Sequence, residues 1–550
     1  MQRDHVRGWR RFLVSPTFRV IPAAPARRSV AGSAFLVMAA SALSAILGFG
    51  REIISAHYYG THPEMDAFLN ASTIPIILFG ILNGAVVSAL VPTFSEYMSL
   101  GRADDVRRLG STVLNALFLT MTGFAALGWA LAPLFVPVTG HGFPPAEQQL
   151  VVRMVRWLMP GIVATSLASV CTALLNANHR FLAGALVWVA ANLVTIGIVV
   201  ALHRELGIFA LVLGTALGLV AQLLVQIPSM LRYRLYRFEV DLRHPGLTKI
   251  WALLVPVTLG SGAAQINIAF DRYFASTLRA GSTAGIGYTT KLVYLPILIV
   301  AGAIATVTFP LIARQFADSD RAGISHSVSL ALRMVTFIVI PCAAGLSVLA
   351  QPIVQTLFER GAFGAAATAL CSSLVPFACA PLIATSYVTV LGKACYACKE
   401  VRLALASSVL TVVLNIVLSA TWLPTLGARG LLLANGVAGF FCATFLLAVL
   451  WRLTGGLEWK PLLSAIVRIS SASLVMAGTL WWMRSLGFIA ITFASRVPYL
   501  LLLLALAATV YIGVSRILGV EELAIVVRML VRKLARPAVT STDTESRAIV

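Results

Sequence analysis

The sequence predicts an all-α integral membrane protein with about 14 transmembrane helices. Hydrophobic residues make up 59% of the 550 residues and charged residues only 11%, against roughly 45–50% and 25% in a soluble protein. The mean hydropathy is +0.89, and the apolar residues form continuous runs instead of alternating, which favours helices over the strands of a barrel. This composition excludes a string of soluble domains and a disordered chain.

Apolar runs of about 20 residues define the candidate spans. The first six lie near residues 30–50, 68–93, 110–136, 151–175, 183–202 and 206–228. The next six lie near 250–270, 284–310, 327–349, 365–391, 403–423 and 429–451, and the last two near 462–483 and 497–519. Loops between spans reach only about 20 residues, as at 229–249. Short loops argue against an enzyme with a catalytic domain outside the membrane.

The basic residues predict the orientation in the membrane. Loops on one side carry about 29 Lys and Arg residues and those on the other about 8, and basic loops stay in the cytoplasm. We therefore expect a multi-pass protein of the bacterial cytoplasmic membrane with both termini inside. Residues 1–29, with seven arginines, form a basic cytoplasmic extension, and residues 520–550 a cytoplasmic tail. The net charge of +21 then reflects topology, and no nucleic-acid partner is expected.

An internal repeat relates the two main parts of the chain. Three residues recur at an offset of 221: Arg51, Gly60 and Pro75 match Arg272, Gly281 and Pro296. The offset equals six spans, so both copies have the same orientation, as in transporters with parallel repeats and a site between the lobes. We expect an N-terminal six-helix lobe at 30–228, a C-terminal six-helix lobe at 250–451 and an additional helix pair at 462–519.

Ionisable residues at or inside the spans are candidate functional groups, because charge is costly in the bilayer. Arg51 and Glu52 end the first span, Asp66 precedes the second, and Asp271 and Arg272 end the seventh. Lys291 lies inside the eighth span, between Thr290 and Tyr294, which indicates a water-filled cavity. Other polar residues have simpler interpretations: snorkelling for Arg153, Arg156 and Arg333, and interhelical hydrogen bonding for Gln265 and Asn267.

The cationic candidates predict an anionic, phosphorylated substrate. Arg51, Lys291 and Arg272 come from both repeat copies, and their side chains suit phosphate oxygens at low dielectric. A pump for cationic drugs would show a buried carboxylate there instead. Cys395 and Cys398 have CxxC spacing, but no second pair or histidine cluster accompanies them. No metal and no cofactor are expected.

Several motifs resemble the MurJ/MviN family of lipid II flippases in the MOP transporter superfamily. The resemblance begins with Leu47-Gly48-Phe49-Gly50-Arg51-Glu52, Gly60 and Asp66-Ala67-Phe68, and covers the chain after residue 30. Weaker matches follow at 91–97, 166–169, 175–181, 288–296 and 309–311. The resemblance implies movement of an undecaprenyl-diphosphate-linked glycan from the inner to the outer leaflet by alternating access. It implies that Arg51 and Lys291 stand at the positions of two family arginines, and Asp66 at that of a family aspartate. In the family, basic groups of the cavity engage the diphosphate.

The sequence also departs from this family pattern. Ala45 replaces the first motif arginine, and Phe79 and Gly80 replace a basic pair in the second span. The partners to be expected are the lipid-linked glycan, membrane lipids and, from the family resemblance, cell-wall synthesis enzymes. Four functions stay open: a lipid II flippase, a flippase for another polyprenyl-linked glycan, a cation-coupled antiporter of related fold, and a scaffold without transport. A membrane enzyme would need a carboxylate or histidine cluster at one face, and His57, His62 and His141 are scattered.

Overall fold

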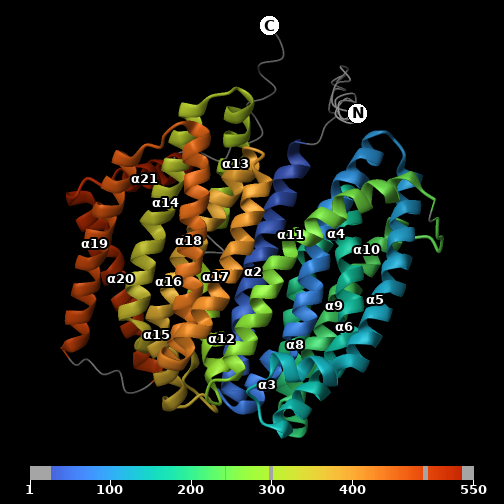
Figure 1. Cartoon of the computed structure of the whole chain (residues 1–550), viewed down its shortest axis with the longest axis horizontal. Helices are drawn as coiled ribbons and strands as arrows, with labels where there is room; N and C mark the ends of the chain where they lie inside the picture. Colours follow the sequence, from blue (N-terminus) through green and yellow to red (C-terminus); the bar gives the residue numbers. More distant parts are fainter. Residues whose placement is uncertain (1–26, 242, 297–300, 487–492, 535–550) are drawn as a thin grey trace, which may run out of the picture.

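Helices make up all the regular structure in the part of the chain that the computed structural model describes, which is residues 27–241, 243–296, 301–486 and 493–534. Residues 1–26 and 535–550, most of the expected extension and tail, lie outside the described residues. The start of α2 and helix α21 lie at the same end of the molecule (Figure 1). The all-α fold is as predicted.

The N-terminal half contains nine helices in the described residues. They are α2 (Arg27–Tyr59), α3 (Pro63–Ala71), α4 (Thr73–Ser99), α5 (Ala103–Thr139), α6 (Pro145–Ala177), α7 (Phe181–Ala185), α8 (Val187–Leu206), α9 (Phe209–Leu224) and α10 (Ile227–Arg232). The predicted second span is divided at Ser72, whose hydroxyl donates to the carbonyl of Phe68 at 2.8 Å. Asp66 therefore lies in a short helix of its own, which begins with Pro63 in the favoured first position.

The C-terminal half and the added helices follow the expected order. The half contains α11 (Pro245–Ser276), α12 (Ser282–Pro296), α13 (Gly302–Ala317), α14 (Arg321–Val348), α15 (Ala350–Phe358), α16 (Ala365–Ala397), α17 (Val401–Leu426) and α18 (Ala428–Thr454). The added helices are α19 (Trp459–Ser485), α20 (Phe493–Ile517) and α21 (Glu521–Leu534).

Eleven helices in the described residues are long and apolar enough to cross a membrane. The other three predicted spans coincide with α4, with α11, and with α12 and α13, between which residues 297–300 are not described. Large apolar side chains are exposed on the spans, including Leu119 at 75% and Leu474 at 71%. Such exposure is expected where lipid replaces water. The chain is thus a multi-pass membrane protein, and the number 14 stays a prediction.

The backbone shows the internal repeat more fully than the sequence does. Five residues with positive φ among residues 27–241 each have a counterpart about 220 residues later. The pairs are Gly60 with Gly281, Gly101 with Ser319, His179 with Lys399, Gly207 with Gly427, and Arg234 with Gly455. The match extends to detail: Gly207 has φ 54° and ψ −133°, and Gly427 has φ 57° and ψ −135°. Two copies of one helical unit therefore build the two halves, with the same hand and direction.

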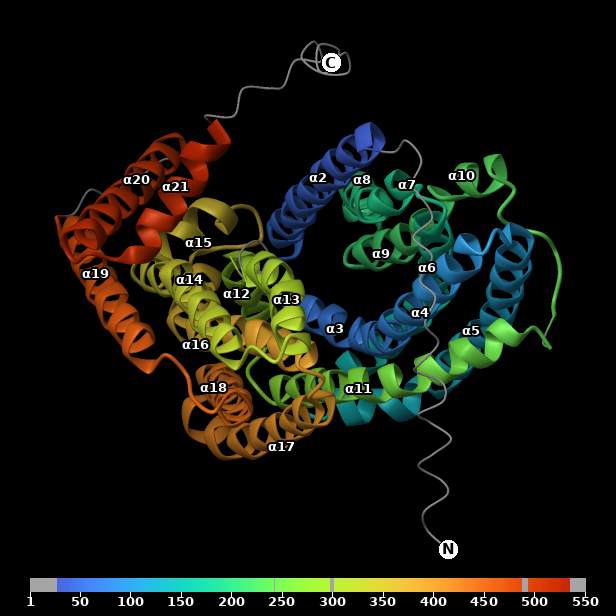
Figure 2. The same cartoon turned by 90° about the horizontal axis from the view of Figure 1, so that it is seen from above.

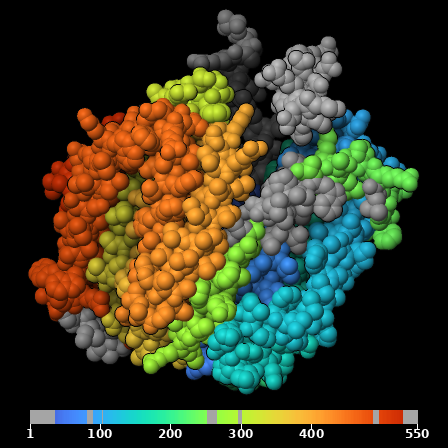
Figure 3. All heavy atoms as spheres, in the orientation of Figure 1, coloured from blue at the N-terminus to red at the C-terminus, as the bar shows by residue number. Residues whose placement is uncertain are grey.

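Helix α11 joins the two halves side by side. It packs along α4 and α5 of the N-terminal half and against α17 and α18 of its own half. Figure 2 shows α11 between α17 and α5, and in Figure 3 the coloured part of α11 lies beside α17. Smaller contacts between the halves connect α3 with α12 and α2 with α15, at the end of the molecule where α3 lies (Figures 1 and 2).

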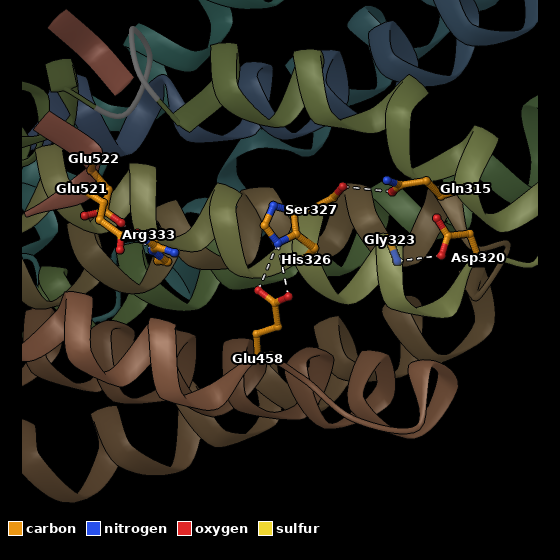
Figure 4. Close-up of polar contacts among 9 residues, drawn as sticks. All are labelled: Gln315, Asp320, Gly323, His326, Ser327, Arg333, Glu458, Glu521 and Glu522. Atoms are coloured by element: carbon orange, nitrogen blue, oxygen red, sulfur yellow. Dashed lines mark hydrogen bonds and ion pairs between the residues drawn. The ribbon is translucent and has the colours of Figure 1, made fainter. Parts of the chain in front are cut away.

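The added helices are bound to α14 by ion pairs at the start of α21 and by a histidine–carboxylate contact just before α19. The guanidinium of Arg333 in α14 pairs with Glu522 and, at 2.5 Å, with Glu521, both at the start of α21 (Figure 4). Nearby, His326 lies 3.1 Å from the carboxylate of Glu458, which precedes α19. The side chain of Arg333 is only 9% exposed. The expectation that it snorkels to the headgroups is wrong, because a buried carboxylate partner compensates its charge.

Candidate functional site

A group of three charged side chains connects the two halves. Glu52 of α2 accepts from Arg51 at 2.9 Å and from Lys291 of α12 at 2.5 Å. The Glu52 side chain is 7% exposed, whereas those of Arg51 and Lys291 are 31% and 41% exposed. Low dielectric around Glu52 strengthens both pairs, and the two cations keep part of their surface accessible. The group carries one net positive charge.

A cavity of about 270 Å³ lies beside this group. Its wall includes Lys291 and Thr290 from α12, Asp271 and Arg272 from α11, and Asn435 from α18. Leu69 contributes from α3 of the other half. Two of the three predicted cations thus share one cavity, and the third is linked to it through Glu52. A polar, cationic cavity next to the contact between two halves is where parallel-repeat transporters place their substrates.

The carboxylate of Asp271 is held by amide side chains from three helices. It accepts hydrogen bonds from Asn415 at 3.0 Å and from Asn435 at 3.1 Å on one oxygen, and from Asn267 at 3.2 Å on the other. Asn415 also donates to Asn267 at 2.8 Å. Interhelical hydrogen bonding by Asn267 is therefore confirmed. These bonds fix α11 against α17 and α18 and hold the neighbouring Arg272 at the cavity wall.

Asp66 joins the halves at the end where α3 lies. One of its oxygens accepts from the backbone N–H of Gly281 at 2.5 Å and the other from that of Ala284 at 2.6 Å. Asp66 is 1% exposed, so its carboxylate is fully occupied by the beginning of α12. A carboxylate there also interacts favourably with the helix dipole. Of the five predicted site residues, Asp66 alone is absent from both the charged group and the cavity wall.

Four glycines allow the halves to touch through their backbones at this same end. They are Gly60, Gly142, Gly281 and Gly361, and a Cβ atom at any of them would come closer than 3.0 Å to a backbone oxygen of the other half. Ala362 donates its N–H to the carbonyl of His57 at 2.8 Å, and Gly142 donates to the Ser276 hydroxyl at 3.2 Å. The contact is too tight for any side chain. This end of the molecule is closed.

Some of these residues were absent from the sequence prediction. Asn415 and Asn435 lie in apolar runs, where a polar amide is costly, and that cost was a usable signal. The sequence carried no signal that Gly142 and Gly361 are special, because a glycine in a loop has many explanations. The paired role of Glu52 also needed the structure, since its second partner is in the other half.

The fold and the site define a membrane transporter: two repeated helical halves, one closed end and a cationic cavity beside the contact between the halves. The family described as "Lipid II flippase MurJ" matches residues 55–511. The chain belongs to this family. It is 28% identical over 469 residues to the "Probable lipid II flippase MurJ" of Vibrio cholerae, covering 82% of this chain and 88% of that one. It is 29% identical over 516 residues to the protein of the same name from Rhizobium tropici, covering 90% and 95%.

Solved structures show the same fold. The one described as "Lipid II flippase MurJ, inward closed conformation" aligns with a TM-score of 0.74 at 22% identity, over 91% of this chain and all of that one. An inward-facing multidrug resistance MATE family transporter of the MOP superfamily aligns with a TM-score of 0.64 at 14% identity, over 77% and 98%. The predicted family is confirmed.

Proposed function

We propose that this chain is a lipid II flippase of the bacterial cytoplasmic membrane, and a transporter with no catalytic chemistry. The observation that carries the proposal is the charged group of Arg51, Glu52 and Lys291, which spans both halves beside a cavity. Family membership supports the substrate, since the relatives are named for lipid II. A diphosphate supplies several anionic oxygens, which two accessible cations from opposite halves are well placed to share.

The pairing in the charged group supports a mechanism of partner exchange. In the structure the two cations are both occupied by Glu52, with Lys291 at 2.5 Å and Arg51 at 2.9 Å. A diphosphate entering the cavity offers them stronger and more numerous acceptors, so they turn from Glu52 to the substrate. The direct link between α2 and α12 is then released, and the halves become free to separate at that level. Arg272 adds a third cation at the cavity wall.

Asp66 and the four glycines supply the second part of the mechanism. We infer that Asp66 holds the closed end by fixing the beginning of α12, and that it does not contact substrate. The lobes expected at 30–228 and 250–451 rock about the cavity, opening this end and closing the other. Basic loops predict that the closed end faces the periplasm, so that the structure takes up substrate from the inner leaflet.

One contact favours a second candidate, a flippase for another polyprenyl-diphosphate glycan. A Cβ atom at Gly80 would lie 2.6 Å from the side-chain amide of Gln265 in α11, so the Gln265 side chain occupies the space beside Gly80. The family resemblance implies a basic pair at 79–80, and here a neutral amide from the other half fills that space. The replacement of a basic pair by a neutral amide would change which glycan head group the cavity recognises, because head groups differ beyond the shared diphosphate.

Complementation separates the two candidates. The gene is expressed in a strain depleted of its own lipid II flippase, with membrane levels of the protein measured in parallel. Growth is the expected result, because lipid II supply is then the limiting step. Arg51→Ala at the same membrane level is the control and should not support growth. Lysis with normal levels of the parent protein would favour the other glycan. Co-purification with cell-wall synthesis enzymes from the same cells tests the expected partners.

A further inference from the structure

A second cavity lies far from the charged group, at one end of the N-terminal half. Its volume is about 340 Å³, and it is formed by the start of α2, the connection from α6 to α7, and the segment from the end of α9 to the residue after α10. Figures 1 and 2 place α10 on the side of the molecule away from α14 and α16. None of the residues around it belongs to the cavity of Lys291.

The lining of this cavity includes one cation, Arg180, and a second, Arg232, directly precedes the lining residue Tyr233. Arg180 is exposed and lies over the ring of Tyr233, 4.3 Å from its centroid, and Arg232 lies 5.9 Å from the same centroid. The tight turn after α6, with His179 at φ 58° and a bond from the Arg180 N–H to the Leu175 carbonyl at 2.8 Å, fixes this arrangement. Both guanidinium groups thus lie close to one aromatic ring, which helps to hold them in place.

These two arginines have no carboxylate partner among the described residues, unlike several of their neighbours. Arg107 pairs with Asp104 at 2.7 Å, Arg108 with Glu239 at 3.2 Å, and Lys249 with Glu96 at 2.7 Å. The acidic groups in this part of the structure are therefore already taken. Two neighbouring cations without a counter-charge repel each other, and a nearby anion offsets that repulsion.

The other wall of the cavity is apolar and open to lipid. Leu36 is 49% exposed and Leu182 47% exposed, and Phe181 and Leu186 extend the same wall. An exposed apolar wall beside a cationic one fits a molecule with an anionic head and a hydrocarbon chain. A soluble anion such as phosphate would use the cationic wall alone.

We propose that this cavity binds an anionic membrane phospholipid, with the phosphate on Arg180 at the cavity wall, Arg232 adding to the local positive charge, and an acyl chain along Leu36 and Leu182. Basic cavities between transmembrane helices on the cytoplasmic side are suited to such head groups. The site is separate from the transport cavity and independent of the proposed substrate. Its occupation fastens the start of α2 to α7 and α10, so the lipid acts as a structural component of the N-terminal half.

The test measures lipid retention by the purified full-length protein. The protein is prepared in a mild detergent, titrated with phosphatidylglycerol or phosphatidylcholine, and analysed by native mass spectrometry. Phosphatidylglycerol should bind in preference, and Arg180→Gln combined with Arg232→Gln should weaken its binding by roughly tenfold or more, as expected for lost charge-assisted hydrogen bonds. The matched control Arg452→Gln removes an exposed arginine from the C-terminal half and should have no effect.

Two further variants distinguish binding of a phospholipid from binding of a free phosphate, and they control for misfolding. Arg180→Lys keeps the charge and should retain most of the binding, and Leu182→Gln should weaken phosphatidylglycerol while leaving binding of glycerol phosphate unchanged. Equal phosphatidylglycerol binding by parent and double variant would overturn the site. Displacement of the lipid by millimolar inorganic phosphate would overturn its assignment to a phospholipid. Either result leaves the flippase proposal unaffected, because that rests on other residues.

Discussion

At the scale of single residues, Glu52 sets the charge that the transport cavity presents. It neutralises one of two neighbouring cations and is itself buried, while Arg51 and Lys291 remain partly accessible. An isolated buried cation would be expensive in lipid, and two would repel each other. The carboxylate therefore makes the empty cavity stable without removing its preference for anions.

Replacement of Arg51 tests whether the N-terminal half contributes to anion binding. Arg51→Ala should abolish transport, and Arg51→Lys should preserve it in part, because arginine offers a planar fork and lysine a single point charge. A charge-assisted hydrogen bond contributes roughly 1.5–3 kcal/mol, so its loss weakens substrate affinity about 10- to 150-fold. Flipping of a labelled undecaprenyl-diphosphate glycan in proteoliposomes measures this. Parental rates for Arg51→Ala would mean that Arg51 is a boundary residue outside the site.

Replacement of Lys291 tests the contribution of the opposite half. Lys291→Met, similar in length but neutral, should cripple transport while membrane insertion stays normal, since it removes a charge from lipid depth. Lys291→Arg should be tolerated or improve binding, because it introduces a bidentate fork. The same proteoliposome assay reports both variants. If the methionine variant flips at the parental rate, the sharing of the diphosphate between the halves must be abandoned.

At the scale of elements, the closed end depends on the loops that flank α3, α12 and α15. Asp66 fixes the first turn of α12, and the four glycines bring loop backbones from both halves into contact. Glycine is required there because the neighbouring atoms are backbone oxygens, which cannot move aside as a side chain can. The end should therefore open if one methyl group is inserted.

Gly142→Ala provides that methyl group. Its Cβ would meet the carbonyl of Ser276, so the variant should shift the protein away from the closed arrangement and slow transport. Cross-linking between cysteines placed at Thr61 and Ser282, on either side of the contact, measures the closed fraction. The matched control is Gly364→Ala, in a neighbouring loop where a Cβ meets nothing within 4 Å; it should cross-link like the parent. Equal yields in all three proteins would contradict the tight contact.

The elements also show what could be predicted from the sequence. The helical spans follow from apolar runs and need no knowledge of distant residues, and Lys291 was recognisable because charge within such a run is costly. The division of α3 from α4 was missed, since the end of α3, Phe68 to Ala71, leads directly into the apolar run of α4. The cluster of Asp271 with Asn415 and Asn435 joins residues 144 and 164 positions apart. No local pattern specifies such pairing, so its geometry had to come from the structure.

At the scale of the whole molecule, the added helices belong to the C-terminal half. Arg333 pairs with Glu521 and Glu522, the Tyr511 hydroxyl donates to the Phe337 carbonyl at 2.6 Å, and Arg484 donates to Gln351 at 2.6 Å. These bonds are spread along α14 and the start of α15. When the halves rock, α19, α20 and α21 must therefore move with the C-terminal half through the surrounding lipid.

The orientation of the whole molecule can be tested by cysteine labelling. In a background without the seven native cysteines, which are buried or partly buried, Phe238→Cys lies in the 229–249 loop, where Phe238 is 87% exposed. It should react with an impermeant reagent only after the cells are opened, because its loop is basic. Arg279→Cys, beside the closed end, should react in intact cells. The opposite pattern would invert the proposed orientation and the direction of uptake.

The closure through backbone atoms has a consequence for how such proteins diverge. A surface formed by side chains must change in concert on both sides, whereas the backbone carbonyl is the same in every residue and the N–H group in every residue except proline. Outside Asp66, Ser276 and the four glycines, mutations in the contacting loops of either half can accumulate here without spoiling the fit of the other. We therefore expect that a chimera combining residues 27–241 of this chain with the C-terminal half of a distant relative still closes at this end, even where its cavity no longer recognises a substrate.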